Sequence, residues 1–225
     1  TLAEIQGAKT EKHPLKADYS LPESYFESEA KLKILPNPNA QTGTLFPKED
    51  IVRLVESAKG IVVIDEAYAL FSGSNAIELL TRFPNLVVTR TMSKSHSLAG
   101  MRVGFGLAAP EIIEAFMKVK DSYNLNAVSQ AAAREALLDG EYTSGVIKKI
   151  VETRDDFGKG LASLGWEVTP SWGNFLLARP NLGDAAEITA YLENNGYLVR
   201  HFDTPRLKDK IRFSIGKKEQ MDELL

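Results

Sequence analysis

The chain has 225 residues, of which 44% are hydrophobic and 25% are charged, and its formal net charge at pH 7 is -3. This length allows a substantial hydrophobic core and two domains. The charges are spread along the chain without long blocks of one sign, which gives no electrostatic reason to expect nucleic acid or a membrane surface as a partner. Because there is no cysteine, the sequence excludes disulfides, thiolate metal sites and a cysteine nucleophile.

The N-terminal residues do not have the pattern of a targeting segment. Residues 1–6 lack the basic and apolar regions of a signal peptide, and the longest apolar runs are too short to span a bilayer. We therefore expect a cytoplasmic protein. The chain begins at Thr1 in what is predicted to be an amphipathic helix, so we expect the sequence to be part of a longer protein.

The first half of the chain alternates between helical and extended patterns. Residues 2–6 are predicted to end a helix closed by Gly7, and residues 9–15 to be extended. Helices are predicted at 21–30 and 48–58, and strands at 31–35, 60–64, 86–88 and 103–108. The β-branched run at 60–64 is typical of a strand that is buried on both faces in a parallel sheet.

Three helices and then a second mixed set follow. The helices are predicted at 111–120, 127–138 and 146–164, the later strands at 166–169, 175–178, 197–202 and 210–215, and the last helices at 185–194 and from 218 onward. This order predicts an α/β protein with a large domain at residues 1–140 and a smaller α/β domain at residues 141–225.

Polar residues follow three of the predicted strands of the large domain. They are the turn-rich segment 37–43, Asp65 after the strand at 60–64, and Lys94 in a hydroxyl-rich loop after the strand at 86–88. In open parallel sheets, functional groups gather at these carboxyl ends. A carboxylate after a buried strand needs a cationic partner, and hydroxyls with an arginine suit a phosphate. Lysine beside a phosphate site suits a carbonyl cofactor such as pyridoxal phosphate (PLP).

The ordered set of motifs resembles the fold-type I PLP-dependent aminotransferases. The Thr42-Gly43 turn, the run from Asp65 to Tyr68, and the Ser93-Lys94 pair with Arg102 follow one another in the order and at the spacing found in that family. Within it, the chain is most similar to the histidinol-phosphate aminotransferase branch, from about residue 35 to the C-terminus. The resemblance implies a PLP-transferase-like large domain with a mostly parallel sheet and a smaller C-terminal α/β domain.

The resemblance also implies roles for the residues that would hold the cofactor. Lys94 would form the Schiff base with PLP and then carry the substrate proton, while Asp65 would pair with the pyridinium nitrogen. Tyr68 would donate to the phenolic oxygen of the cofactor. Further cofactor contacts would come from Arg102, Thr91 and Ser93, which would bind the phosphate.

For the substrate, the resemblance implies a second group of side chains. Arg212 matches the arginine that binds the substrate carboxylate in aminotransferases. In the histidinol-phosphate branch it would face the substrate phosphate, with Arg200 beside it. Two arginines without a neutralising carboxylate suit a phosphate dianion. Asn174 matches a family position near the substrate. A small-molecule amino donor and a 2-oxo acid acceptor are the implied reactants, and a homodimer is expected by analogy.

Two departures from the family pattern stand out. The usual Asn-Pro-Thr-Gly run reads Ala40-Gln41-Thr42-Gly43, so we assign the asparagine contact to Asn39. The Gly/Ser turn for the phosphate and the aromatic residue that stacks on the pyridine ring precede this segment in family members, and neither is present here. We therefore expect the N-terminal part of the large domain to be missing.

Other functions remain as alternatives. An aromatic amino acid aminotransferase or a threonine-phosphate decarboxylase would use the same scaffold, and a non-enzymatic chain would keep the sheet and bind only a partner. Asp65-Glu66 also resembles a Walker B motif, but no P-loop is present, and the glycines lack dinucleotide-binding spacing. The three histidines share no ligand spacing, so no metal site is predicted. Taken singly, Tyr68 could be a core tyrosine and the two arginines could be surface ion-pair partners.

Overall fold

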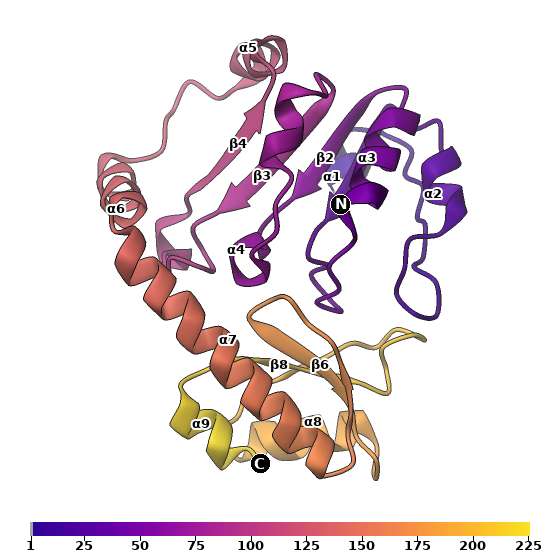
Figure 1. Cartoon of the computed structure of the whole chain (residues 1–225), viewed down its shortest axis with the longest axis vertical. Helices are drawn as coiled ribbons and strands as arrows, with labels where there is room; N and C mark the ends of the chain where they lie inside the picture. Colours follow the sequence, from indigo (N-terminus) through magenta and orange to yellow (C-terminus); the bar gives the residue numbers. More distant parts are fainter. Residues whose placement is uncertain (1) are drawn as a thin grey trace.

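Two β-sheets joined by a long helix organise residues 2–225, which are the residues that the computed structural model describes (Figure 1). The first sheet has the order β1 (Leu32–Pro36), β2 (Ile61–Asp65), β3 (Leu86–Thr91) and β4 (Gly104–Ala108). Strands β1, β2 and β3 run parallel, whereas β4 is antiparallel to β3. The carboxyl ends of the three parallel strands therefore lie at one edge, which faces the second sheet (Figure 1).

The second sheet is antiparallel throughout. Its order is β5 (Glu167–Thr169), β6 (Phe175–Arg179), β8 (Ile211–Ser214) and β7 (Arg200–His201). The predicted strand at 197–202 is shorter than expected, because only Arg200 and His201 pair with β8. A separate core lies against this sheet and includes Phe157, Leu176 and Phe213. The boundary between residues 140 and 141 stays a prediction, but the two sheets have separate cores.

Each helix predicted from the sequence is present in the structure. The helices are α1 (Leu2–Ile5), α2 (Glu23–Glu27), α3 (Lys48–Ser57), α4 (Ala69–Ser72), α5 (Pro110–Val119), α6 (Ala127–Leu138), α7 (Gly140–Ser163), α8 (Ala185–Asn194) and α9 (Lys218–Glu223), with 3-10 turns η1 (Ile77–Thr81) and η2 (Ala99–Met101). The helix predicted at 146–164 begins earlier, at Gly140, because the Asp139 side chain accepts a hydrogen bond from the Tyr142 N–H at 3.1 Å and caps it. The short α4, η1 and η2 were not predicted.

Strand β2 is buried on one face only, which corrects the prediction of burial on both. Val62 and Ile64 are fully buried in a core with Leu54 of α3, while Ile61 and Val63 on the opposite face are half-buried. The reason is that α3 and η1 both pack against the same face of the sheet. On the other face Ile34 of β1 is 57% exposed.

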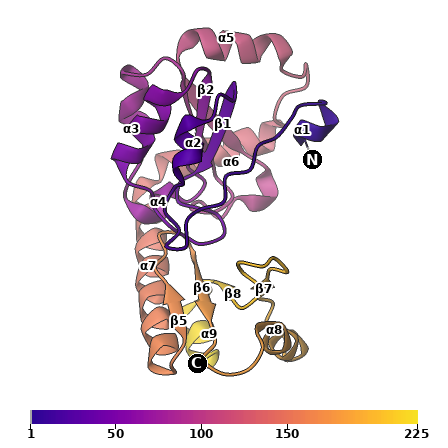
Figure 2. The same ribbon diagram turned by 90° about the vertical axis from the view of Figure 1, so that its right-hand side faces the viewer.

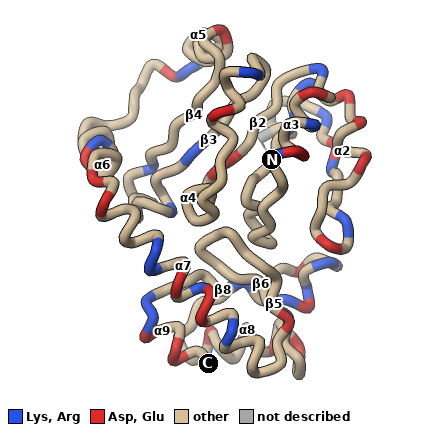
Figure 3. Tube along the Cα trace, in the orientation of Figure 1, with Lys and Arg blue, Asp and Glu red and all other residues tan. Residues whose placement is uncertain are grey.

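The long helix α7 leads from the first sheet to the second and packs along β5 and β6 (Figures 1 and 2). Phe157 and Leu161 of this helix are buried in the second core. Acidic and basic residues are interspersed over both parts of the chain (Figure 3). No helix among residues 2–225 is long and apolar enough to cross a membrane.

Candidate active site

The candidate site lies at the carboxyl edge of the first sheet. The register places Asp65 opposite Pro36 of β1 and opposite Thr89 of β3. The segment 37–43, the Asp65 turn and the lysine loop therefore start from neighbouring strands, as the sequence predicts. Phe175 and Arg212, on β6 and β8 of the second sheet, approach this edge from the opposite side.

Lys94 and Tyr68 are brought together from two different strand ends. The Lys94 Nζ lies 5.9 Å from the centroid of the Tyr68 ring, and the Lys94 side chain is exposed. The Tyr68 ring meets Phe175 edge-on, with centroids 5.2 Å apart. A primary amine that is open to solvent beside a phenol can react with a carbonyl group.

Burial keeps the phenol of Tyr68 protonated. Burial raises the pKa of Tyr68, and the negative charge of Asp65 raises it further, while the Arg212 guanidinium lowers it. The phenol is therefore a hydrogen-bond donor at neutral pH. Asp65 itself is half-buried, and its Oδ1 accepts a hydrogen bond from the Ala67 N–H at 3.1 Å.

The hydroxyls of the lysine loop form a local cluster. The Thr91 Oγ1 lies 2.9 Å from the Ser93 Oγ and accepts a hydrogen bond from the Ser93 N–H at 3.1 Å. Arg102 has a left-handed backbone, with φ of 55°, and its exposed guanidinium donates to the Ala99 carbonyl at 3.0 Å. The binding of a phosphate by these three residues stays a prediction.

Arg212 and Arg200 share one face of the second sheet. They are paired directly across β8 and β7, and both guanidiniums lie 5.4 Å from the centroid of the Phe202 ring. Arg212 also lies over the Phe175 ring, at 4.9 Å, and its Nη1 donates to the Ala40 carbonyl at 2.6 Å. Among the described residues neither arginine forms a salt bridge.

The guanidinium of Arg212 is only partly hydrogen-bonded among the described residues. The Nε is buried and has no hydrogen-bond partner within residues 2–225. A buried N–H without a partner is rare, and each case asks for a specific explanation. An anion that accepts from the guanidinium would satisfy it.

The hydrogen bonds of Asn39 and Asn174 are made within their own loop or through the backbone. The Asn39 Oδ1 accepts hydrogen bonds from the N–H groups of Gln41 and Thr42 at 3.0 and 3.1 Å, so its oxygen shapes the loop. Asn174 precedes Phe175 and accepts a hydrogen bond from the Ile215 N–H through its backbone carbonyl at 2.9 Å. Their contacts to cofactor and substrate stay predictions.

The segment that precedes β6 contacts the 37–43 loop directly. The Trp172 N–H donates to the Gly43 carbonyl at 2.9 Å. Gly43 has φ of +79°, and a Cβ there would lie 2.1 Å from the Ser171 Oγ. Only glycine therefore fits this close contact between the two domains.

Sequence reasoning missed an ion pair directly behind the site. Glu66 and Arg90 pair in the interior, and each is adjacent in sequence to a predicted cofactor residue, Asp65 and Thr91. The signal was present, because the argument that a carboxylate after a buried strand needs a cationic partner applies to Glu66 as much as to Asp65. The sequence analysis also did not identify Phe175 and Phe202, whose rings lie next to the guanidiniums of Arg212 and Arg200.

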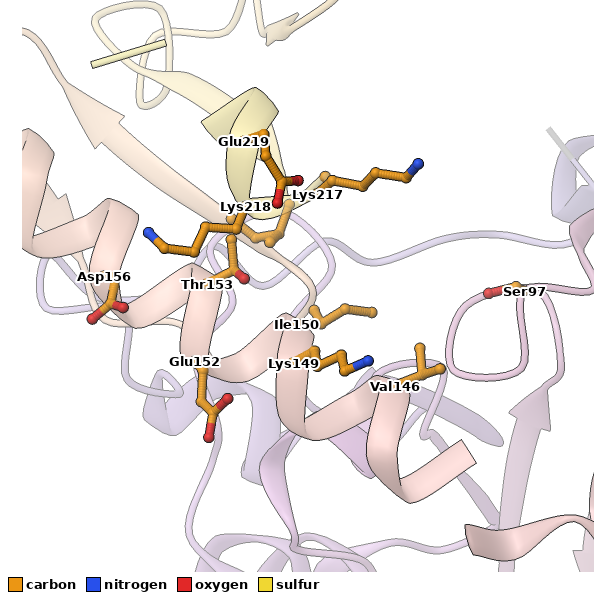
Figure 4. A pocket seen from close by; sticks show the side chains of 12 residues that line it. Ser97, Val146, Lys149, Ile150, Glu152, Thr153, Asp156, Lys217, Lys218 and Glu219 are labelled. Carbon is orange, nitrogen blue, oxygen red and sulfur yellow. The ribbon is translucent and has the colours of Figure 1, made fainter. Parts of the chain in front are cut away.

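A separate cleft of about 770 Å³ lies between α7 and the start of α9, with Ser97 of the lysine loop at its edge (Figure 4). Its charged residues carry both signs, with Lys149, Lys217 and Lys218 against Glu152, Asp156 and Glu219. Neither Lys94 nor Tyr68 lines it. Within the described residues, no group of three or more His, Asp or Glu side chains is arranged to hold a metal ion.

Comparison with known proteins gives the family. Residues 8–225 match the family described as "Aminotransferase class I and II". The chain belongs to this family. Histidinol-phosphate aminotransferases from Geotalea uraniireducens and Geobacter sulfurreducens are 44% and 43% identical to it, and each alignment covers 100% of this chain. The resemblance to the fold-type I aminotransferases and to their histidinol-phosphate branch is confirmed.

The expected fold is confirmed by solved structures. The histidinol-phosphate aminotransferase from Sinorhizobium meliloti, determined in complex with pyridoxal-5'-phosphate, is 29% identical with a TM-score of 0.88. A protein from Erwinia carotovora atroseptica, described as a putative histidinol-phosphate aminotransferase, is 26% identical with a TM-score of 0.89. The alignments cover 99% of this chain and 64% and 67% of those chains. The chain spans about 65% of the length of the curated relatives it matches.

Proposed function

We propose that the full-length protein is a PLP-dependent aminotransferase that transfers the amino group of histidinol phosphate to 2-oxoglutarate. The observation that carries the proposal is the meeting of Lys94, Tyr68 and Arg212 at the edge that holds Asp65. The names of the relatives support the same activity. A cytoplasmic location and a homodimer are part of the proposal.

The described residues fit PLP. When bound, PLP supplies a carbonyl carbon for the amino group and a ring that accepts electrons from the substrate carbon. Lys94 offers an accessible amine, Asp65 a carboxylate for the ring nitrogen, and Tyr68 a protonated phenol. The hydroxyls of Thr91 and Ser93 with Arg102 would hold the phosphate group. Asn39 would contribute through its side-chain amide.

The substrate anion is assigned to the two arginines. Arg212 has a buried Nε that lacks a partner among the described residues, and Arg200 lies opposite it across the sheet. Two guanidiniums on one face suit a phosphate dianion better than a single carboxylate. Asn174, which lies beside Phe175, would line the same side of the site.

The test is borohydride reduction of the full-length protein with PLP, followed by peptide mapping. We expect a phosphopyridoxyl group on Lys94, and no such group in Lys94→Ala. Because Lys94 is exposed, this variant should keep the thermal stability of the wild type. A wild-type protein that gives no labelled lysine, or a label equally present in Lys94→Ala, would contradict the proposal.

A second candidate is a decarboxylase. The L-threonine-O-3-phosphate decarboxylase from Porphyromonas gingivalis is 26% identical with a TM-score of 0.75 and covers 86% of this chain. Both candidates would use arginines for a phosphorylated substrate. Release of CO2 from threonine phosphate without a 2-oxo acid would favour the decarboxylase, whereas formation of glutamate from 2-oxoglutarate and histidinol phosphate would favour the aminotransferase.

A further inference from the structure

Two charged residues lie directly behind the candidate site. Glu66 follows Asp65, and Arg90 precedes Thr91. Successive side chains of a strand point to opposite faces of the sheet, so Glu66 and Arg90 point away from the face that carries Asp65 and Thr91. The ladder continues to this point, because the Glu66 N–H donates to the Thr89 carbonyl at 2.8 Å.

The pair is buried, and both oxygens of Glu66 are used. The side chains of Glu66 and Arg90 are 1% and 16% exposed. The Glu66 Oε2 accepts from the Arg90 Nε at 2.9 Å and from its Nη2 at 2.7 Å, while Oε1 accepts from the Ala76 N–H. Glu66 therefore links the end of β2 to the end of β3 and to the segment that precedes η1.

Stability alone does not explain the choice of charged residues. Burying two charges costs about as much as their attraction returns, and a well-packed apolar pair often stabilises as much. An arginine fork, however, holds a carboxylate at a defined distance and direction. A cavity of about 250 Å³ lies beside the pair and is also lined by Thr91, Ser95 and Phe105. Because side chains do not fill this space, the ion pair and the backbone hydrogen bond from Glu66 to Thr89 together fix the separation of the strand ends.

We propose that Glu66 and Arg90 are positioning residues of the aminotransferase site. They hold the end of β2, which carries Asp65, at a fixed separation from the end of β3, which leads into Thr91 and Lys94. A cofactor bound between Asp65 and Lys94 would contact both strand ends, so its binding depends on this separation. The inference rests on the proposed function, and Glu66 and Arg90 act through their neighbours without touching the reacting atoms.

The test compares three variants of the full-length protein. Glu66→Gln removes the charge and keeps the shape. The double variant Glu66→Leu with Arg90→Met replaces the pair by apolar side chains of similar size, so that neither charge is buried alone, although the Ala76 N–H loses its acceptor. Leu54→Ala is the control, because it opens a cavity in the first core, on α3, and Leu54 is fully buried there.

Two properties besides turnover are measured: the dissociation constant for PLP and the pH midpoint of the visible absorbance of the bound cofactor. Misplacement of a binding group by a fraction of an ångström lowers binding and rate steeply, so we expect PLP affinity to fall on the order of tenfold or more in both pair variants. The pH midpoint should shift as well. Leu54→Ala should lower the melting temperature and leave both properties at their wild-type values.

The possible results separate a positioning role from a purely structural role of the ion pair and from failure of the proposed function. If the double variant binds PLP with wild-type affinity and midpoint, or if Glu66→Gln loses only thermal stability as Leu54→Ala does, the pair is structural and the inference is wrong. If the wild type takes up no PLP, the proposed function itself fails. If the wild type is labelled on Lys94 and only the pair variants lose affinity and shift the midpoint, the positioning role is supported.

Discussion

Replacing Arg212 by methionine should weaken the use of a phosphorylated substrate far more than it weakens the fold. The guanidinium donates one hydrogen bond to Ala40, and its buried Nε has no partner among the described residues. An anion held by the free side of the fork would accept two charge-assisted hydrogen bonds, each contributing about 1.5–3 kcal/mol. Their loss corresponds to roughly 3–6 kcal/mol, or about a 10²- to 10⁴-fold lower kcat/KM.

The unfolding free energy should change much less. Methionine keeps the apolar contacts with the Phe175 and Phe202 rings, so the loss is about 1 kcal/mol for the hydrogen bond to Ala40. Because the positive charge of Arg212 lowers the pKa of Tyr68, the substitution should also raise that pKa further.

Steady-state kinetics with histidinol phosphate and urea denaturation measure the two effects. Arg179→Met is the matched control, because Arg179 lies on β6 of the same sheet and forms an exposed ion pair with Glu167. Surface pairs of this kind contribute about 1 kcal/mol or less, and kcat/KM should not change. An Arg212→Met variant whose kcat/KM equals that of Arg179→Met would refute the assignment of the anion to Arg212.

Two further predictions concern the stability of the fold. Gly43→Ala should destabilise the protein more than Gly73→Ala, because both glycines have positive φ but only a Cβ at Gly43 would collide with Ser171, at 2.1 Å. The left-handed backbone alone costs roughly 1–2 kcal/mol at either position. Equal losses of unfolding free energy in urea denaturation would contradict the role of the contact between the domains. Burial raises the pKa of Tyr25 to about 12, above the ordinary value of 10.0, so the unfolded state binds fewer protons in that range and stability should fall as pH rises from 10 to 12. Tyr25→Phe should reduce this fall, at a cost of about 1 kcal/mol near pH 7 for the hydrogen bond to the Ile34 carbonyl. Denaturation curves at pH 10 and pH 12 check the prediction, and an unchanged pH dependence would be evidence against it.

Local patterns in the sequence were enough for the longer helices, the strands and the parallel part of the first sheet, but not for the short α4, η1 and η2. Helix α3 was predicted to within a residue at its end, because the spacing of Ile51, Leu54 and Val55 reflects burial along one helix face. The run in β2 predicted a strand but overstated its burial. Burial on the second face depends on what packs there, and no periodicity in a short apolar run carries that information.

The sequence by itself determined the order of the chemical groups, from Asp65 and Tyr68 to Lys94 and Arg212, and this order is sufficient for the family. Only the tertiary structure decided how these groups meet: that Phe175 lies between Tyr68 and Arg212, that Arg212 reaches the Ala40 carbonyl, and that Glu66 pairs with Arg90. Such contacts join residues that are far apart along the chain. They depend on the register of two sheets and on the path of α7, and neighbouring residues in the sequence do not encode them.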